Sequence, residues 1–152
     1  MLPKTTNSRS QKINRFSRHG FKVSKRRAWR VAGNLPASFR YAMQGLAYAF
    51  FSQRNFRIHI ALGLVAFSLG VWLQLNLNHL AVLVLTVTAV LVLELLNTAI
   101  EAVVDLAIGR HFHPLAKIAK DCAAAAVLAA SISSLLIALL LLAPPFLIHI
   151  GL

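Results

Sequence analysis

Three long apolar runs constrain this chain more than any other feature of its sequence. They cover about residues 58–76, 80–108 and 122–143. As a helix, a run of roughly 18 or more apolar residues can cross the ~30 Å hydrocarbon core of a bilayer. The chain is 58% hydrophobic and only 13% charged, whereas a soluble domain of 152 residues would need far more surface charge. We therefore predict an all-α membrane protein with three transmembrane helices.

The segment before the first run divides into two parts. Residues 1–34 are basic and lack clear periodicity, so we predict a mobile cytoplasmic arm that binds anionic lipid headgroups. Residues 36–52 have apolar side chains at helical spacing, namely Phe39, Met43, Leu46, Ala47 and Phe50. This pattern favours an amphipathic helix in the membrane interface over a helix packed against other helices. With the three spans, it defines a membrane domain over residues 35–147.

The positive charges predict the topology. Thirteen of the sixteen Lys and Arg precede residue 58, and the other three are Arg110, Lys117 and Lys120. Because Lys and Arg favour the cytoplasmic side, the N-terminus and the segment between the second and third spans should both be cytoplasmic. The net charge of +12 would also suit nucleic acid. Long apolar segments separate the two basic groups, which argues against nucleic-acid binding.

Local signals predict the helix ends. The polar residues 76–79 should form the turn between the first two spans. Gly109 is a plausible stop for the second span, and residues 109–121 should connect it to the third. Pro144 and Pro145 should end the third span, since proline disrupts a helix interior.

Three of the four acidic residues lie in the second half of the second run, and the fourth, Asp121, follows it. Relative to Glu94 on a helix, Asn97 sits at about 300°, Glu101 at about 340° and Asp105 at about 20°, so all share one face. A lone charged side chain in a span costs ~2.5–3.5 kcal/mol. Protonation, basic partners or a bound divalent cation must offset that cost.

Phosphoryl transfer would use this set of residues. Carboxylate oxygens suit Mg²⁺, and Lys117, Lys120 and Asp121 follow close behind. A base for an acceptor hydroxyl, a metal for phosphates and cations for the remaining charge are the parts that such a transfer needs. The alternatives are an ion or proton transporter using the stripe of Glu94 and Glu101, or polar contacts between helices. The sequence has no P-loop.

Three segments carry a family resemblance. "ELLNTAIEAVVD" (94–105) followed by "HPLAKIAKDCAAAAV" (113–127) closely resembles the bacterial diacylglycerol kinase and undecaprenol kinase family, as does "FRYAMQGLAYAFFSQRNFRIH" (39–59). The resemblance covers about residues 35–143. It implies a homotrimer in the bacterial inner membrane, with composite sites between subunits. It also implies transfer of the γ-phosphate of MgATP to the hydroxyl of diacylglycerol or undecaprenol.

The resemblance also assigns roles to residues near the lipid. It implies that Glu94 is the general base facing the lipid hydroxyl and that Asn97 orients polar groups beside it. Ser38 would contact the lipid substrate. His59 differs from the better-known diacylglycerol kinases, which have an acid there, and looks more like the polyprenol-kinase branch.

Further residues are implied for MgATP. Glu101 would hold the metal on ATP, and Gln53 stands where the family usually has a second, metal-holding glutamate. An amide oxygen can still ligate Mg²⁺, but without charge. The nucleotide would be contacted by Tyr41, Glu101, His113, Lys120 and Asp121.

Overall fold

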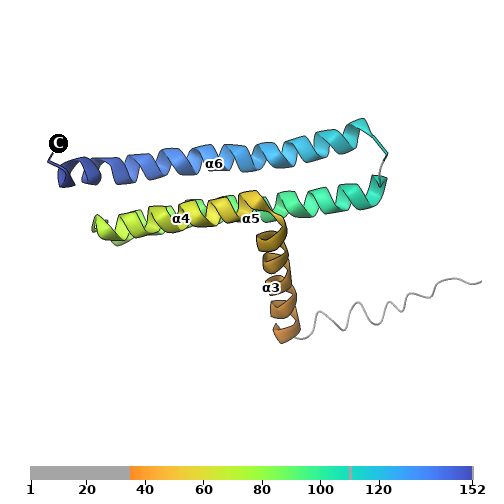
Figure 1. Ribbon diagram of the computed structural model, residues 1–152, viewed down its shortest axis with the longest axis horizontal. Helices are drawn as coiled ribbons and strands as arrows, with labels where there is room; N and C mark the ends of the chain where they lie inside the picture. The colour runs from red at the N-terminus through yellow and green to blue at the C-terminus, as the bar shows by residue number, and fades with distance from the viewer. Residues whose placement is uncertain (1–34, 110, 152) are drawn as a thin grey trace, which may run out of the picture. The chain divides into compact units, whose positions relative to one another are not determined.

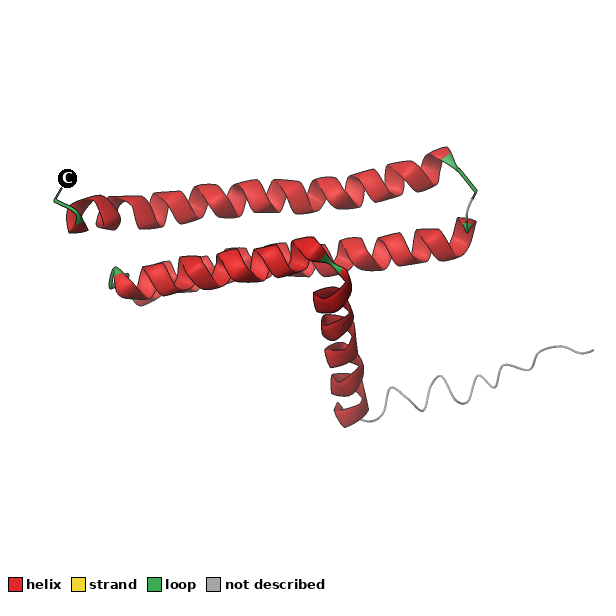
Figure 2. Cartoon of the chain, viewed as in Figure 1, coloured by secondary structure: helices red, strands yellow, loops and turns green. Residues whose placement is uncertain are grey.

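The described part of the chain is helical throughout. The computed structural model describes residues 35–109 and 111–151, and the predicted basic arm lies outside them. The elements are α3 (Leu35–Ser52), α4 (Arg54–Trp72), α5 (Leu77–Ile108) and α6 (Pro114–His149) (Figures 1 and 2). Of these, α4, α5 and α6 are long and apolar enough to cross a membrane. An all-α fold with three spans and an N-terminal helix is therefore confirmed.

The chain divides into two units between Ala42 and Met43, so α3 contributes residues to both. In the first unit, the guanidinium of Arg40 lies 5.4 Å from the ring centroid of Tyr41. In the second, α3 ends with the aromatic side chains of Phe50 and Phe51 exposed and in edge contact. The position of this helix in the membrane interface stays a prediction.

Helix α4 packs against α5 through small residues. Its buried positions are Phe56, Gly63 and Gly70, which recur every seven residues along one face. A Cβ added to Gly63 would lie 2.5 Å from Cγ1 of Val87, so the two backbones approach each other closely there. Small residues at helix contacts permit such an approach in membrane proteins.

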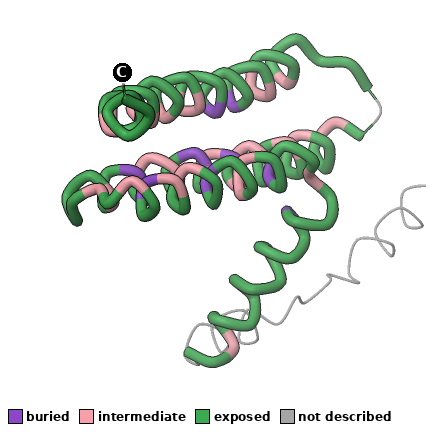
Figure 3. The backbone as a smooth tube through the Cα atoms, turned by 60° about the vertical axis from the view of Figure 1, so that its left-hand side comes forward, coloured by how far each residue is buried: buried purple, intermediate pink, exposed green. Residues whose placement is uncertain are grey.

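Helix α5 contacts both α4 and α6, which also contact each other. The buried residues include Leu83 and Val90 of α5 and Ala123 and Val127 of α6. Figure 3 shows that buried stretches are few and that most of each helix is intermediate or exposed. Most other apolar side chains of the three helices are exposed. That distribution fits a bundle whose outer surface meets lipid, where apolar exposure carries no hydrophobic cost.

Of the two predicted boundaries of α5, the first is displaced and the second matches. The turn between α4 and α5 covers residues 73–76 and not the predicted 76–79, because Asn76 caps the helix: its Oδ1 accepts a hydrogen bond of 2.9 Å from the backbone N–H of His79. This side chain is an N-cap of the preferred kind. At the other end of α5, Gly109 is the C-cap with a φ of 60°, in the region that favours glycine. The predicted stop at Gly109 is confirmed.

The third predicted span is too short at both ends. Helix α6 begins at Pro114, not near residue 122, because proline suits the first helical position and His113 caps the helix. The Nδ1 atom of His113 accepts a 3.2 Å hydrogen bond from the N–H of Leu115. At the other end, the helix continues through Pro144 and Pro145 to His149. Each proline lacks an N–H donor and crowds the carbonyl four residues earlier, but membrane helices tolerate proline, and this helix does not end there.

Candidate active site

Glu94 is the only buried charged residue among the described residues, with 4% of its surface exposed. It lies on the face of α5 that meets α4. The Nε2 atom of His59, on α4, is 3.4 Å from Oε1 of Glu94. The backbone carbonyl of Glu94 also accepts a 2.9 Å hydrogen bond from the hydroxyl of Thr98. The carboxyl of Glu94 is therefore buried in the bundle beside the imidazole of His59.

One turn further along α5, Asn97 and Glu101 form a second polar pair. Nδ2 of Asn97 donates a 3.1 Å hydrogen bond to Oε1 of Glu101. Within the described ranges, Oδ1 of Asn97 is buried and has no hydrogen-bond partner. This leaves an amide oxygen and a carboxylate side by side, with acceptor capacity unused.

These oxygens fit a magnesium ion in part. Mg²⁺ in phosphate-transferring sites is bound by one or two carboxylates plus substrate phosphates and water. Glu101 and Oδ1 of Asn97 are suitable donors. Residues 35–109 and 111–151 contain no group of three His, Cys, Asp or Glu that could hold a metal. Gln53 is the N-cap of α4, and its side chain makes no capping hydrogen bond.

Two ion pairs lie toward the ends of α5 and α6 that are joined by the 109–113 connection. Lys120 Nζ is 2.5 Å from Oδ1 of Asp105, which links the two helices. Lys117 pairs with Asp121 one turn along α6. The adjacent Lys120 and Asp121 therefore have different partners. His113 is exposed at the N-cap of α6.

The polar residues of α5 extend along the helix from the bundle interior toward its C-terminal end. At ~1.5 Å per residue, the 32 residues of α5 measure about 48 Å against a hydrocarbon core of ~30 Å. On the same scale Glu94 lies about 26 Å and Glu101 about 36 Å from Leu77. If Leu77 marks one edge of the hydrocarbon, Glu94 lies near the other edge and Glu101 beyond it.

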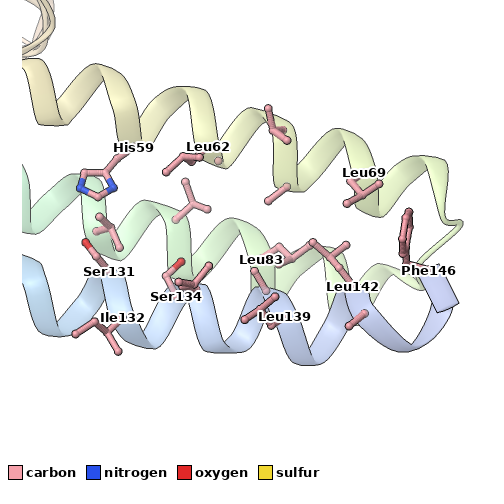
Figure 4. Close-up of a pocket in the computed structure, with 18 residues that line it drawn as sticks. His59, Leu62, Leu69, Leu83, Ser131, Ile132, Ser134, Leu139, Leu142 and Phe146 are labelled. Atoms are coloured by element: carbon pink, nitrogen blue, oxygen red, sulfur yellow. The ribbon is translucent and has the colours of Figure 1, made fainter.

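An apolar groove of about 610 Å³ ends at His59, the residue that contacts Glu94. It is formed by α4, α5 and α6, and its lining is mainly apolar, with His59, Ser131 and Ser134 as its polar residues. Figure 4 shows His59 and Ser131 at one end of the groove and Phe146 at the other. His59 thus belongs both to the groove and to the contact with Glu94.

The predicted site residues fall into separate groups. Glu94, Asn97 and Glu101 follow one face of α5, whereas Lys120 and Asp121 lie on α6 near its start. Ser38 and Tyr41 belong to the part of α3 in the first unit, where both are exposed.

Two contacts with the acidic stripe were not predicted from the sequence. The contact of His59 with Glu94 was one, although a signal for it exists. His59 lies three residues after Phe56 and four residues before Gly63, both of which are buried. Residues three and four apart share a helix face, so His59 lies on the face that packs against α5. The Asp105–Lys120 pair was the other, and no local pattern marks it.

The fold and the site define a membrane protein of three spans, with a carboxylate site that begins inside the bundle. A model of the prokaryotic diacylglycerol kinase family matches residues 40–142. A diacylglycerol kinase of Synechocystis sp. is 52% identical over 126 residues, covering 83% of this chain and 72% of that protein. An undecaprenol kinase of Bacillus subtilis is 39% identical over 107 residues, covering 70% and 86%. A diacylglycerol kinase of Escherichia coli is 39% identical over 92 residues, covering 60% and 75%.

The chain belongs to the prokaryotic diacylglycerol kinase family. It is therefore a phosphotransferase of the bacterial membrane that acts on a lipid alcohol. The resemblance predicted from the sequence is confirmed, and the alternative of an ion or proton transporter has no support.

Proposed function

We propose that this protein transfers the γ-phosphate of MgATP to the hydroxyl of a membrane lipid alcohol, diacylglycerol or undecaprenol. One observation carries the proposal: a buried carboxyl, Glu94, begins a polar stripe that continues toward the C-terminal end of α5. An enzyme that joins a lipid to a water-soluble phosphate donor needs a base near the hydrocarbon edge and phosphate-binding groups beyond it. The depths of Glu94 and Glu101 along α5 meet that need.

Glu94 acts as the general base in this proposal. Its carboxylate accepts the proton of the lipid hydroxyl while that oxygen forms a bond to the γ-phosphorus. The bond from the γ-phosphorus to the bridging oxygen breaks, and ADP leaves with the electron pair. The apolar groove would suit the lipid chain, because it ends at His59, whose Nε2 lies 3.4 Å from Oε1 of Glu94.

Glu101 and Oδ1 of Asn97 would hold magnesium, with Gln53 as a further oxygen donor. Mg²⁺ bound there would offset negative charge on the phosphates. Lys120, which pairs with Asp105, would supply the cation for the remaining phosphate charge. Further nucleotide contacts are assigned to Asp121, His113 and Tyr41, and Ser38 is assigned to the lipid.

The remaining parts of the proposal concern membrane and assembly. We place the N-terminus in the cytoplasm, because the positive charge then lies on the cytoplasmic side. ATP would reach the C-terminal end of α5 from that side. The assembly that we propose, a homotrimer with sites shared between subunits, rests on the family resemblance.

The test is an assay of purified protein in mixed micelles with labelled ATP, Mg²⁺ and both lipid alcohols. Wild type should phosphorylate at least one lipid. Glu94→Gln keeps the side-chain shape but removes the base, so we expect turnover to fall about 10²–10⁴-fold with nucleotide binding retained. Ser133→Ala is the control, because that hydroxyl is exposed and donates a hydrogen bond to the carbonyl of Ala129 in its own helix. Near-normal turnover of Glu94→Gln would remove Glu94 from the role of base.

A further inference from the structure

The carboxyl of Glu94 has one close basic neighbour. Among the described residues, His59 is the only basic side chain within ion-pair distance of it. The side chain of Glu94 is 5% exposed and that of His59 is 22% exposed. A buried carboxyl needs a partner to offset its lost hydration, and an imidazole can donate to it or accept from it.

The packing of α4 on α5 fixes this neighbour in place. Phe56, one turn before His59, is 2% exposed, and Gly63, one turn after it, is also buried. The contact of Gly63 with Val87 leaves no room for α4 to move toward α5. The imidazole is therefore attached to a backbone held on both sides, and not to a mobile loop.

We propose that His59 is a positioning residue for phosphoryl transfer. It holds one oxygen of the Glu94 carboxyl, Oε1, so that the other faces the lipid hydroxyl at the end of the groove. This inference rests on the proposed function, since it assigns Glu94 the role of base. A base must lie within hydrogen-bond reach of the proton it removes, so a fixed carboxyl orientation favours the reaction.

His59 also borders the space in which the lipid chain would lie. It lines the apolar groove at the end where Ser131 is found (Figure 4). One side chain therefore contacts the base and forms the wall next to the lipid. The loss of His59 should lower turnover and change the apparent affinity for the lipid, and leave the apparent affinity for ATP unchanged.

Two substitutions separate positioning from simple packing. His59→Leu removes both ring nitrogens, and His59→Gln retains a donor on a chain of similar reach. We expect His59→Leu to lower kcat about 10–100-fold, because a misplacement of ~1 Å can cost ~10²-fold. His59→Gln should recover a large part of that loss, and the KM for ATP should stay constant in both variants. His79→Leu is the matched control, because that histidine is exposed at the start of α5.

A second measurement does not depend on activity. In protein labelled with ¹⁵N-histidine in micelles, Glu94→Gln should shift the ring resonances of His59 and leave those of His79 unchanged. If wild type is an active kinase but the His59 resonances do not shift, or His59→Leu keeps the wild-type kcat, the positioning role is refuted and the proposed function stands. If His59→Leu fails to fold, His59→Gln and the resonance shift decide. If the resonances shift but wild type phosphorylates neither lipid, the proposed function fails and the positioning role fails with it.

Discussion

The contact between Gly63 and Val87 allows a quantitative test of how α4 is placed. A methyl group added in Gly63→Ala would lie 2.5 Å from Cγ1 of Val87, whereas carbon atoms in good contact are ~3.5–4.0 Å apart. Either the helices separate by about 1 Å or a stiff β-branched side chain must shift. Overpacking of this kind costs about 1–3 kcal/mol.

Gly45→Ala isolates that cost. Gly45 lies in α3, and a Cβ added there meets nothing within 4 Å. Both substitutions share the helix-propensity gain of Ala over Gly, ~0.8–1.0 kcal/mol, so their difference in unfolding free energy measures the clash. We expect Gly63→Ala to be less stable than Gly45→Ala by about 1–3 kcal/mol in reversible unfolding in mixed micelles.

Val87→Ala should relieve the clash. In the Gly63→Ala background it removes the γ-carbons of Val87, so a double-mutant cycle should give a favourable coupling of about 0.5–3 kcal/mol. Turnover should follow, because Gly63 is one turn from His59 and a displaced α4 also displaces the imidazole. Equal stability of Gly63→Ala and Gly45→Ala, with no coupling to Val87→Ala, would refute the close approach of the two helices.

Two further predictions concern magnesium and nucleotide. Gln53→Glu should lower the Mg²⁺ concentration needed for half-maximal turnover, because a carboxylate adds charge to the oxygen ligands. An unchanged requirement in a Mg²⁺ titration would show that Gln53 does not face the metal. Lys120→Gln should raise the KM for ATP about tenfold while changing stability by less than ~1 kcal/mol, because exposed ion pairs such as that with Asp105 contribute little to folding. Asp105→Asn should leave stability similarly unchanged, and a large loss of stability in either variant would instead make the pair structural.

The sequence predicts the fold well because membrane helices depend on local composition. An apolar run reveals a span by itself, and a period of 3.6 residues was enough to group Glu94 with Glu101 on one face. Helix ends were less predictable where two local rules compete. Pro114 acts as a helix start and Pro145 lies within a helix, although both are prolines. Pro114 occupies the first helical position, where its missing N–H has no partner to lose. Pro145 has formed helix on both sides of it.

The site was less predictable than the fold, because its contacts join residues distant in sequence. The Glu94–His59 and Asp105–Lys120 contacts each connect two helices, and their register depends on how those helices pack. A helical wheel gives the face of α5 but not the residue of α4 opposite it. The spacing of Phe56 and Gly63 marks the packed face of α4, but the depth of each helix in the membrane sets which residues meet.

The partners of the four acids explain how so few carboxylates are tolerated beside lipid. Glu94 has His59, Glu101 has Asn97, and the two acids furthest along, Asp105 and Asp121, have lysines. The permanently charged partners, the lysines, therefore belong to Asp105 and Asp121. These two acids lie near the connection between α5 and α6, where water can also solvate the ion pairs. Glu94, the acid nearest the hydrocarbon, has a partner that is charged only when protonated.

A fixed lysine beside Glu94 would stabilise its carboxylate and weaken it as a base, whereas an imidazole holds the carboxyl in place without a permanent counter-charge. By this argument, His59→Lys should lower turnover even if it strengthens the ion pair. Wild-type turnover in that variant would show that a permanent charge on the partner makes no difference.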